Sequence, residues 1–406
     1  MTDIGDVVRL RVTAAANGGH CVGRSAQGQV VFARHTLPGE LIDATITGVG
    51  KGGRYLLADA TTIVEPAPGR VAPMCRWAGR CGGCDFQHAS AATQLQVKRD
   101  IVVDLLQRIG KLTDIGGRPV SDAIDLVEVQ SGMQAGAAYG VGSRSRVRYV
   151  MGADGVPSMR GHHSHDLVPV GSCPLGGSAL AAAITSTAPT LAEGSQVECI
   201  EDDDGTVHLV VDGEPLTGDV VVRRVGERSW YLQPTGFWQV HPRAAEVLSE
   251  LVASAAAFET GQQVLDLYAG AGLFTAVAAV AVGSTGRVDA VESSIESVND
   301  GATALADLEH VHFHGDDVAH WLRANRQAYD VVLLDPPRAG AGTNVVRGIA
   351  ATRAQVVVYV SCDAATFARD AGQFAAHGYR LETLSLVDLF PMTGHTETVA
   401  RFAKAH

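Results

Sequence analysis

The sequence predicts an α/β protein in three parts: a small N-terminal β-barrel, a central α+β domain, and a C-terminal domain built on a parallel sheet. From residue 264 onward, short apolar runs alternate with helix-like stretches, a texture typical of βαβ units. Residues 6–64 instead hold short β-rich runs broken by Gly-rich turns, which predicts a barrel. A Pro-rich linker at 65–73 follows the barrel. We therefore place the three domains at residues 1–66, 67–235 and 236–406.

The composition is that of a globular chain. Of the 406 residues, 46% are hydrophobic and 19% are charged, which is enough apolar surface for a buried core. No apolar run approaches the roughly 18 residues that span a bilayer. We therefore expect a cytoplasmic protein without membrane contact, and a monomer. Seven cysteines at uneven spacing argue against a secreted disulfide framework and favour metal ligation or a reactive thiol.

The net charge of −12 is unfavourable for binding nucleic acid, whose phosphates are usually met by surplus Lys and Arg. The charge is unevenly spread along the chain. Residues 1–70 carry seven basic and six acidic side chains, so the predicted barrel is the least acidic part. The run 144-RSRVRY-149 is a local concentration of arginine, which a solvated strand face would explain equally well.

Periodicity predicts the elements that flank the C-terminal sheet. Residues 91–110 place Leu95, Val102 and Leu105 at helical spacing, and Gly110 is a suitable stop. Near the C-terminus, 386-LVDLFP-391 and 396-TETVARFA-403 predict two strands that close the sheet.

A cofactor site is predicted at the carboxyl edge of this sheet. The strand in 264-VLDLYAGAGLFT-275 carries Asp266 and runs into a Gly-rich turn that lets a ligand approach the backbone closely. A tight turn without a ligand would explain this stretch alone. Glu292 and Asp316, however, end the next two predicted strands, and the ends of parallel strands share one edge. Because no Gly-Lys phosphate loop is visible, a nucleoside cofactor without a phosphate fits best, and S-adenosylmethionine is such a cofactor.

Reactive side chains follow the remaining strands. The motif 335-DPPR-338 ends the fourth strand, and its prolines stiffen the loop because each fixes φ near −65°. The motif 361-SCD-363 ends the fifth and puts Cys362 at the sheet edge, where it is either a working thiol or a packed core cysteine. Glu397, on the last strand, is either a functional carboxylate or a surface one.

Three cysteines lie within ten residues in 75-CRWAGRCGGC-84. The candidates for a fourth ligand are Cys21, Cys173 and Cys199. Structural zinc sites usually pair two short C-x₂₋₄-C units, whereas C-x₅-C-x₂-C with a remote fourth cysteine is closer to iron–sulfur sites. The spacing therefore favours an iron–sulfur cluster and leaves zinc open.

Taken together, these features resemble the RNA uracil-5-methyltransferases, in particular the bacterial ribosomal-RNA branch that carries an N-terminal TRAM domain and a [4Fe-4S] cluster. The resemblance covers nearly the whole chain and rests on the barrel segment, the clustered cysteines and five motifs: 237-FWQVHP-242, 266-DLYAGAGLF-274, 333-LLDPPRAG-340, 359-YVSCD-363 and 388-DLFPMTGHTE-397. It implies a class I Rossmann-like domain that methylates uracil C5 with S-adenosylmethionine, with Cys362 as nucleophile and Glu397 as general base. The implied cofactor contacts are Gln239, Tyr268, Glu292, Asp316 and Asp335, and the implied cluster ligands are Cys75, Cys81, Cys84 and Cys173.

The resemblance favours 23S ribosomal RNA as the substrate, with transfer RNA as the alternative. We expect the RNA to be held by the cations Arg9, Arg11, Arg24, Arg34, Lys51, Arg54, Arg144, Arg146 and Arg148. The sequence departs from the family at two positions. Asp363 follows the cysteine where the family has Asn, and His241 stands where the Gln239 motif usually ends in Asn. A carboxylate next to Cys362 would disfavour the thiolate.

Two other functions compete with this interpretation. Methyltransferases that act on an exocyclic amine place an aromatic residue after the Pro-Pro pair, but Arg338 stands there and Cys362 would have no task. A non-catalytic RNA-binding protein, with a TRAM-like module on a degenerate enzyme fold, is disfavoured by the intact Cys362, Glu397 and cofactor acids.

Overall fold

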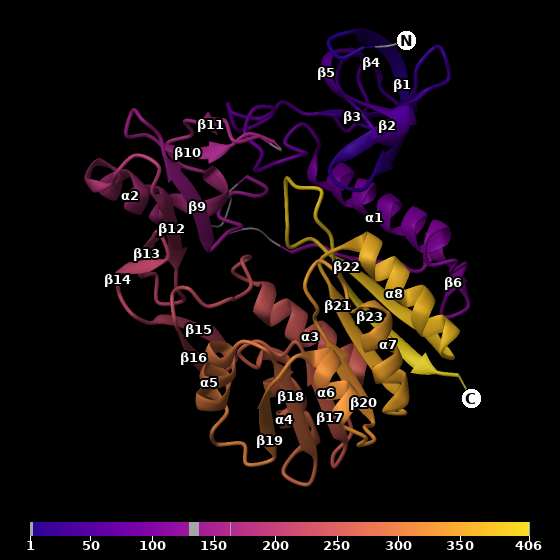
Figure 1. Cartoon of the computed structure of the whole chain (residues 1–406), viewed down its shortest axis with the longest axis vertical. Coiled ribbons are helices and arrows are strands. Elements are labelled where there is room, and N and C mark those ends of the chain that lie inside the picture. The colour runs from indigo at the N-terminus through magenta and orange to yellow at the C-terminus, as the bar shows by residue number, and fades with distance from the viewer. Residues whose placement is uncertain (1–2, 130–137, 163, 406) are drawn as a thin grey trace.

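The computed structural model describes residues 3–129, 138–162 and 164–405. Figure 1 shows a barrel near the N-terminus, a central sheet with its own helix, and a larger C-terminal sheet flanked by helices. Within the described ranges, no helix is both long enough and apolar enough to cross a membrane. The predicted α/β class and the N-terminal barrel are confirmed.

Five strands close the barrel: β1 (Val7–Ala16), β2 (His20–Arg24), β3 (Val30–Arg34), β4 (Leu41–Val49) and β5 (Tyr55–Glu65). Successive side chains of a strand point to opposite faces, so every second residue enters the barrel. Leu10, Ile42 and Leu56 are among those that fill its core. The barrel therefore has a hydrophobic core of its own.

The central sheet is antiparallel and six-stranded, in the order β11-β10-β9-β12-β13-β14. Its strands are β9 (Arg146–Met151), β10 (Pro157–Arg160), β11 (Leu167–Val168), β12 (Gln196–Glu201), β13 (Val207–Val211) and β14 (Glu214–Thr217). Helix α2 (Gly177–Thr187) buries Leu180 and Ile184 in the core beneath this sheet. Two short hairpins complete the region: β6 (Asp114–Ile115) with β7 (Arg118–Pro119), and β15 (Val221–Val225) with β16 (Arg228–Leu232).

The C-terminal sheet has eight strands in the order β19-β18-β17-β20-β21-β23-β22-β8. They are β8 (Ile124–Val127), β17 (Gln263–Leu267), β18 (Arg287–Glu292), β19 (Val311–Gly315), β20 (Val331–Leu334), β21 (Val356–Ser361), β22 (Tyr379–Val387) and β23 (Glu397–Lys404). Neighbours from β19 to β21 are parallel, whereas β23 is antiparallel to both β21 and β22. The closing strand predicted over 396–403 is confirmed as β23, whereas the one predicted over 386–391 is wrong, because β22 ends at Val387 and a loop follows it.

Helices cover both faces of this sheet. One face packs against α1 (Ala91–Arg108), α6 (Val318–Ala324), α7 (Gly342–Ala351) and α8 (Ala364–Ala376), and the other against α3 (Ala244–Ala256) and α4 (Leu273–Val282); α5 (Ile295–Ala304) lies beside β16 and β19. Burial on both faces explains the continuous apolar runs of β20 and β21. Helix α1 and strand β8 come from the chain between 67 and 235 but pack with the C-terminal sheet. The central segment therefore contributes elements to the surroundings of the catalytic sheet.

Candidate active site

Strand register brings Cys362 and Glu397 together. Strand β21 ends at Ser361, and α8 begins two residues after Cys362. The last pair in the register of β21 with the antiparallel β23 is Ser361 with Thr398, and Cys362 and Glu397 are the chain neighbours of that pair. The charge of Glu397 acts on the Cys362 thiol, so the two side chains lie close together. The two residues that the motifs singled out separately therefore meet at the carboxyl edge of β21.

Asp335 brings a second carboxyl group to this edge. It follows β20, whose last residue, Leu334, pairs with Tyr359 of β21. Burial, followed by the charge of Asp335, raises the pKa of Glu397 well above its ordinary value. Burial, followed by the charge of Asp266, raises the pKa of Asp335 to about 7. The raised pKa makes the Glu397 carboxylate a stronger base than that of an exposed glutamate.

The Cys362 thiol is protonated at neutral pH in the free protein. Burial, and then the charges of Glu397 and Asp335, raise its pKa to about 12, while Arg338 acts in the opposite direction. A thiolate is the nucleophilic form of cysteine. Proton removal from Cys362 is therefore a step that the site must accomplish, and the guanidinium of Arg338 favours it.

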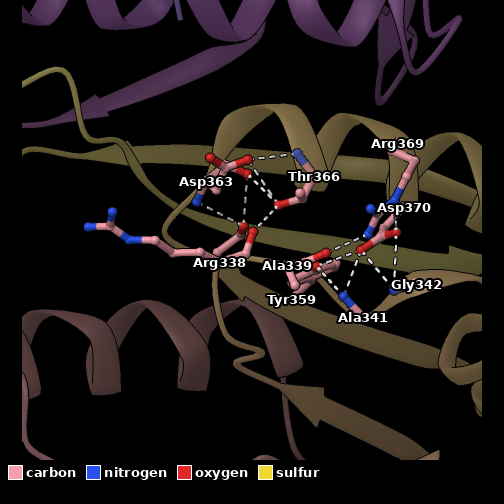
Figure 2. Close-up of polar contacts among 10 residues, drawn as sticks. Arg338, Ala339, Ala341, Gly342, Tyr359, Asp363, Thr366, Arg369 and Asp370 are labelled. Carbon is pink, nitrogen blue, oxygen red and sulfur yellow. Dashed lines mark hydrogen bonds and ion pairs between the residues drawn. The ribbon is translucent and has the colours of Figure 1, made fainter. Parts of the chain in front are cut away.

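The loop that carries Arg338 is fixed by α8 (Figure 2). The buried Asp370 carboxylate accepts hydrogen bonds from Ala341 N at 2.8 Å and from the Tyr359 hydroxyl at 2.9 Å. Thr366 Oγ1 donates to the carbonyl oxygen of Arg338 at 3.1 Å. The Arg338 side chain extends away from the Asp370 anchor in Figure 2. It thus projects from a loop that is rigid at both ends.

The start of α8 explains why Asp363 can stand where the family has Asn. Asp363 is the N-cap of this helix, and its Oδ1 accepts a hydrogen bond from Thr366 N at 2.8 Å. Asp and Asn are both strong N-cap residues, so the replacement keeps the local geometry. The carboxylates that raise the Cys362 pKa are those of Glu397 and Asp335. The adjacent Asp363 is therefore a helix cap, and the predicted effect on the thiol comes from other acids.

His241, the second departure, is 2% exposed. Its Nδ1 accepts a hydrogen bond from Arg243 N at 3.2 Å, so the proton of the neutral ring lies on Nε2. Burial lowers the pKa of His241 to about 4, which keeps the ring neutral. Nε2 has no hydrogen-bond partner in the part of the chain that the structure describes. His241 thus presents an N–H donor where the family has an amide.

Tyr268 and Glu292 flank the Gly-rich turn after β17. Tyr268 adopts a φ of 61°, a left-handed conformation that is strained for a non-glycine residue. Glu292 Oε2 accepts a hydrogen bond from Gly270 N at 3.1 Å, and its Oε1 accepts one from Ser294 N at 2.7 Å. A Cβ placed on Gly270 would meet nothing within 4 Å. The turn therefore has open space beside a carboxylate whose position is fixed.

The other residues predicted to contact the cofactor make fewer contacts with one another. Asp316 N donates to the Glu292 carbonyl at 3.1 Å, while the Asp316 carboxylate pairs with His320 at 2.8 Å. Gln239 lies half-buried on the segment between β16 and α3. Asp266, absent from the predicted contacts, is 1% exposed and accepts a hydrogen bond from Thr275 Oγ1 at 2.6 Å. It ties β17 to the first turn of α4.

The cysteines predicted as cluster ligands line one cavity of about 20 Å³. They are Cys75, Cys81, Cys84 and Cys173. Cys84 Sγ accepts a hydrogen bond from Gln87 Nε2 at 3.4 Å. Cys21 lies instead in the barrel core and Cys199 in β12, both fully buried. The remote cysteine that shares the cavity is thus Cys173.

The metal itself is not confirmed by this arrangement. Among residues 3–129, 138–162 and 164–405, no group of three or more His, Cys, Asp or Glu side chains stands in a geometry that would hold a metal ion. The four cysteines are therefore gathered in one place without converging as ligands. Burial raises the pKa of the Cys84 thiol to about 12.

Several of the arginines predicted to hold RNA have less free positive charge than the sequence implies. Ion pairs with carboxylates engage Arg9, Arg11, Arg34, Arg146 and Arg148. In β9, for example, Arg146 and Arg148 share Glu198, and Arg146 also donates to the carbonyl of Gly236 at 2.9 Å. A paired guanidinium contributes less to phosphate binding because its charge is already compensated. Counting arginines along the chain therefore overestimates the positive potential.

Comparisons with known proteins agree with this geometry. A tRNA (Uracil-5-)-methyltransferase family model matches residues 320–404, and a TRAM domain model matches residues 2–61. An uncharacterised RNA methyltransferase of Streptomyces coelicolor is 36% identical, over 98% of this chain and 93% of its own length. The 23S rRNA (uracil(1939)-C(5))-methyltransferase RlmD of Acinetobacter baylyi is 30% identical, over 94% of this chain and 90% of its own.

A solved structure shares the fold of the whole chain. The tRNA (uracil-54, C5)-methyltransferase of Pyrococcus abyssi, determined with S-adenosyl-L-homocysteine, superposes with a TM-score of 0.70 at 20% identity and covers 97% of this chain and 100% of its own. The similarities in sequence extend over both the barrel and the catalytic sheet, and the motifs at Cys362 and Glu397 lie within the matched region. The chain therefore belongs to the family of S-adenosylmethionine-dependent RNA uracil-5-methyltransferases.

Proposed function

We propose that this enzyme methylates C5 of a uridine in 23S ribosomal RNA, with Cys362 as the nucleophile and Glu397 as the base. The closeness of Cys362 and Glu397, the chain neighbours of the Ser361–Thr398 pair at the edge of a Rossmann-like sheet, carries the proposal. The substrate named for the Acinetobacter relative supports ribosomal RNA. The target uridine must leave its stack to reach a thiol at a sheet edge, which is easiest in a loop or single strand.

Cys362 supplies the activation that uracil lacks. C5 of uracil is too weak a nucleophile to take a methyl group, so the thiolate adds at C6 and moves electron density onto C5. The connection between β21 and α8 presents the thiol at the rim of the sheet. Arg338 favours the thiolate and lies on a loop that Asp370 holds in place. The activated C5 then attacks an electrophilic methyl group, which S-adenosylmethionine supplies.

Glu397 completes the cycle. After methyl transfer C5 still carries its proton, which must leave before the C6–sulfur bond can break and free the enzyme. A carboxylate with a raised pKa is the stronger base for this proton, and burial together with Asp335 raises the pKa of Glu397. The closeness of Glu397 to the Cys362 thiol supports this role, because a uracil bound to that thiol would lie beside the carboxylate. We assign cofactor contacts to Gln239, Tyr268, Glu292, Asp316 and Asp335.

The direct test is the product. In vitro transcripts of 23S rRNA and of tRNA are incubated with the enzyme and S-adenosylmethionine, digested to nucleosides and analysed by mass spectrometry. We expect 5-methyluridine from the 23S transcript. Methylation confined to adenine or cytosine would contradict the reaction, and 5-methyluridine found in tRNA alone would contradict the substrate.

We also propose that Cys75, Cys81, Cys84 and Cys173 hold a [4Fe-4S] cluster. Four cysteines on one cavity are the donor set that such clusters use. Burial raises the pKa of Cys81, Cys84 and Cys173, and Arg144, which donates to the Gly83 carbonyl at 3.2 Å, acts in the opposite direction. The cluster would supply a covalent tie between the first three cysteines and the remote Cys173. The proposal requires the four side chains to converge on the cavity.

Anaerobically purified protein is therefore expected to be brown and to contain about four irons per chain. Metal analysis and visible absorbance measure this. Cys81→Ser should lose both iron and colour, whereas Cys21→Ala, which removes a buried barrel thiol outside the cavity, should keep them. A colourless protein with one zinc per chain would show that the spacing had been assigned to the wrong metal.

A further inference from the structure

The loop of residues 388–396 leads directly into Glu397, the first residue of β23. In Figure 1 it rises from the sheet edge beside the start of α1. Met392, near its middle, adopts a φ of 66°, which is strained for a side chain other than glycine. Strained conformations persist only where the surroundings hold them in place. The contacts around Met392 therefore show what determines the course of this loop.

Gln94 of α1 holds the middle of the loop. Its side chain is fully buried, and its Oε1 accepts a hydrogen bond from Met392 N at 2.7 Å. The amide nitrogen donates to the carbonyls of Phe86 and Ala89 at 3.2 and 2.9 Å. These donors and acceptors fix which way the amide faces. The carbonyl of Met392 is held as well, because it accepts from Phe86 N at 2.9 Å.

Lys98, one helical turn further along α1, holds the start of the loop. Its Nζ donates to Asp388 Oδ1 at 2.9 Å and to the Phe390 carbonyl at 2.8 Å. The two charged side chains are only 1% and 2% exposed. Tyr139 donates to the other oxygen of Asp388. A buried charge without a partner is strongly disfavoured, so this ion pair keeps the loop start against the helix.

We infer that Gln94 and Lys98 are positioning residues that hold Glu397 in place for proton removal. Residues four apart lie on one face of a helix, so α1 presents both side chains to the same loop. They lie in the segment 67–235, outside the predicted catalytic domain, and act through the loop on a base at its far end. Cys362 is carried by another connection, between β21 and α8. The loop reaches the surroundings of the thiol through His395, whose Nε2 lies 3.2 Å from Arg338 Nη2. The inference rests on the proposed role of Glu397.

The variants Gln94→Met and Lys98→Met test it in the full-length enzyme. Gln94→Met keeps the length of the side chain and Lys98→Met shortens it by one atom, and both remove the polar contacts with the loop. Gln96→Met is the matched control, because Gln96 is an exposed glutamine on the same helix whose bond is to Asp100. Three quantities are measured: kcat and KM on a 23S rRNA transcript, the amount of RNA–protein adduct on denaturing gels during turnover, and the rate of adduct formation with 5-fluorouridine-containing RNA.

We expect kcat to fall roughly 100-fold in Gln94→Met and Lys98→Met, the effect of a catalytic group displaced by about 1 Å, while KM and the rate of adduct formation stay within about threefold. Adduct should then accumulate on the unsubstituted transcript, because addition continues and release is slow. Gln96→Met should behave as the wild type. If Lys98→Met does not fold, Gln94→Met decides the question alone.

Equal losses in adduct formation and turnover would show that α1 only stabilises the fold, and unchanged kcat in Gln94→Met would show that the loop needs no such support. Either result overturns the inference. Failure of the proposed function looks different. In that case the wild type itself forms no adduct with 5-fluorouridine RNA, or Glu397→Gln does not accumulate one.

Discussion

Cys362→Ala is expected to abolish both methyl transfer and covalent capture of RNA. Loss of a catalytic nucleophile lowers turnover on the order of 10⁴-fold or more, because the remaining groups cannot activate C5. The substitution removes one sulfur atom from a half-buried position between β21 and α8, so the fold should remain intact. The measurement is a denaturing gel with 5-fluorouridine-containing RNA, in which fluorine at C5 prevents release of the adduct. A shifted band that persists in Cys362→Ala would place the nucleophile elsewhere.

The pH dependence of the wild type checks the same residue. Burial, Glu397 and Asp335 raise the pKa of Cys362 to about 12, so the thiolate fraction increases with pH throughout the neutral range. The rate of adduct formation should therefore rise about tenfold per unit between about pH 7 and 9. Cys21→Ala, a matched loss of a buried thiol in the barrel, should show the wild-type profile. A rate that is already constant at pH 7 would mean that the thiol ionises more easily in the RNA complex than in the free protein.

Glu397→Gln is expected to form the adduct and fail to release it. Glutamine has the shape of glutamate but cannot take the C5 proton, and loss of a general base lowers turnover roughly 10²–10⁴-fold. Adduct formation should be equal to or faster than in the wild type, because Glu397 is one of the charges that raise the Cys362 pKa. Mass spectrometry of the trapped complex should find a methyl group already on the uracil.

The matched control is Glu250→Gln, which changes an exposed glutamate at the surface of α3. It should turn over as the wild type does. A trapped complex without a methyl group would show that Glu397 acts before methyl transfer. Full turnover in Glu397→Gln would assign proton removal to another group, and Asp335 is the nearest carboxyl in the strand order.

The elements and several groups of the site follow from local sequence patterns. Alternating apolar runs predicted the parallel sheet, and acids at successive strand ends predicted its ligand edge, because the carboxyl ends of parallel strands lie together. The helix predicted over 91–110 forms over Ala91–Arg108. The resemblance carried by the sequence motifs singled out Cys362 and Glu397 and gave Cys173 as the fourth cluster ligand. Each of these depends on a few neighbouring residues, which a sequence displays directly.

What only the tertiary structure decided is how distant segments meet. The antiparallel register of β21 and β23, which brings Cys362 close to Glu397, arises from side-chain packing on both faces of the sheet. Glu198 compensates Arg146 and Arg148 across two strands, so the arginine run does not act as free charge. Gln94 and Lys98 read as ordinary polar residues in the sequence of α1, and their significance lies in partners almost 300 positions away. Such contacts are fixed by the packing of whole elements, which leaves no local periodicity from which to infer them.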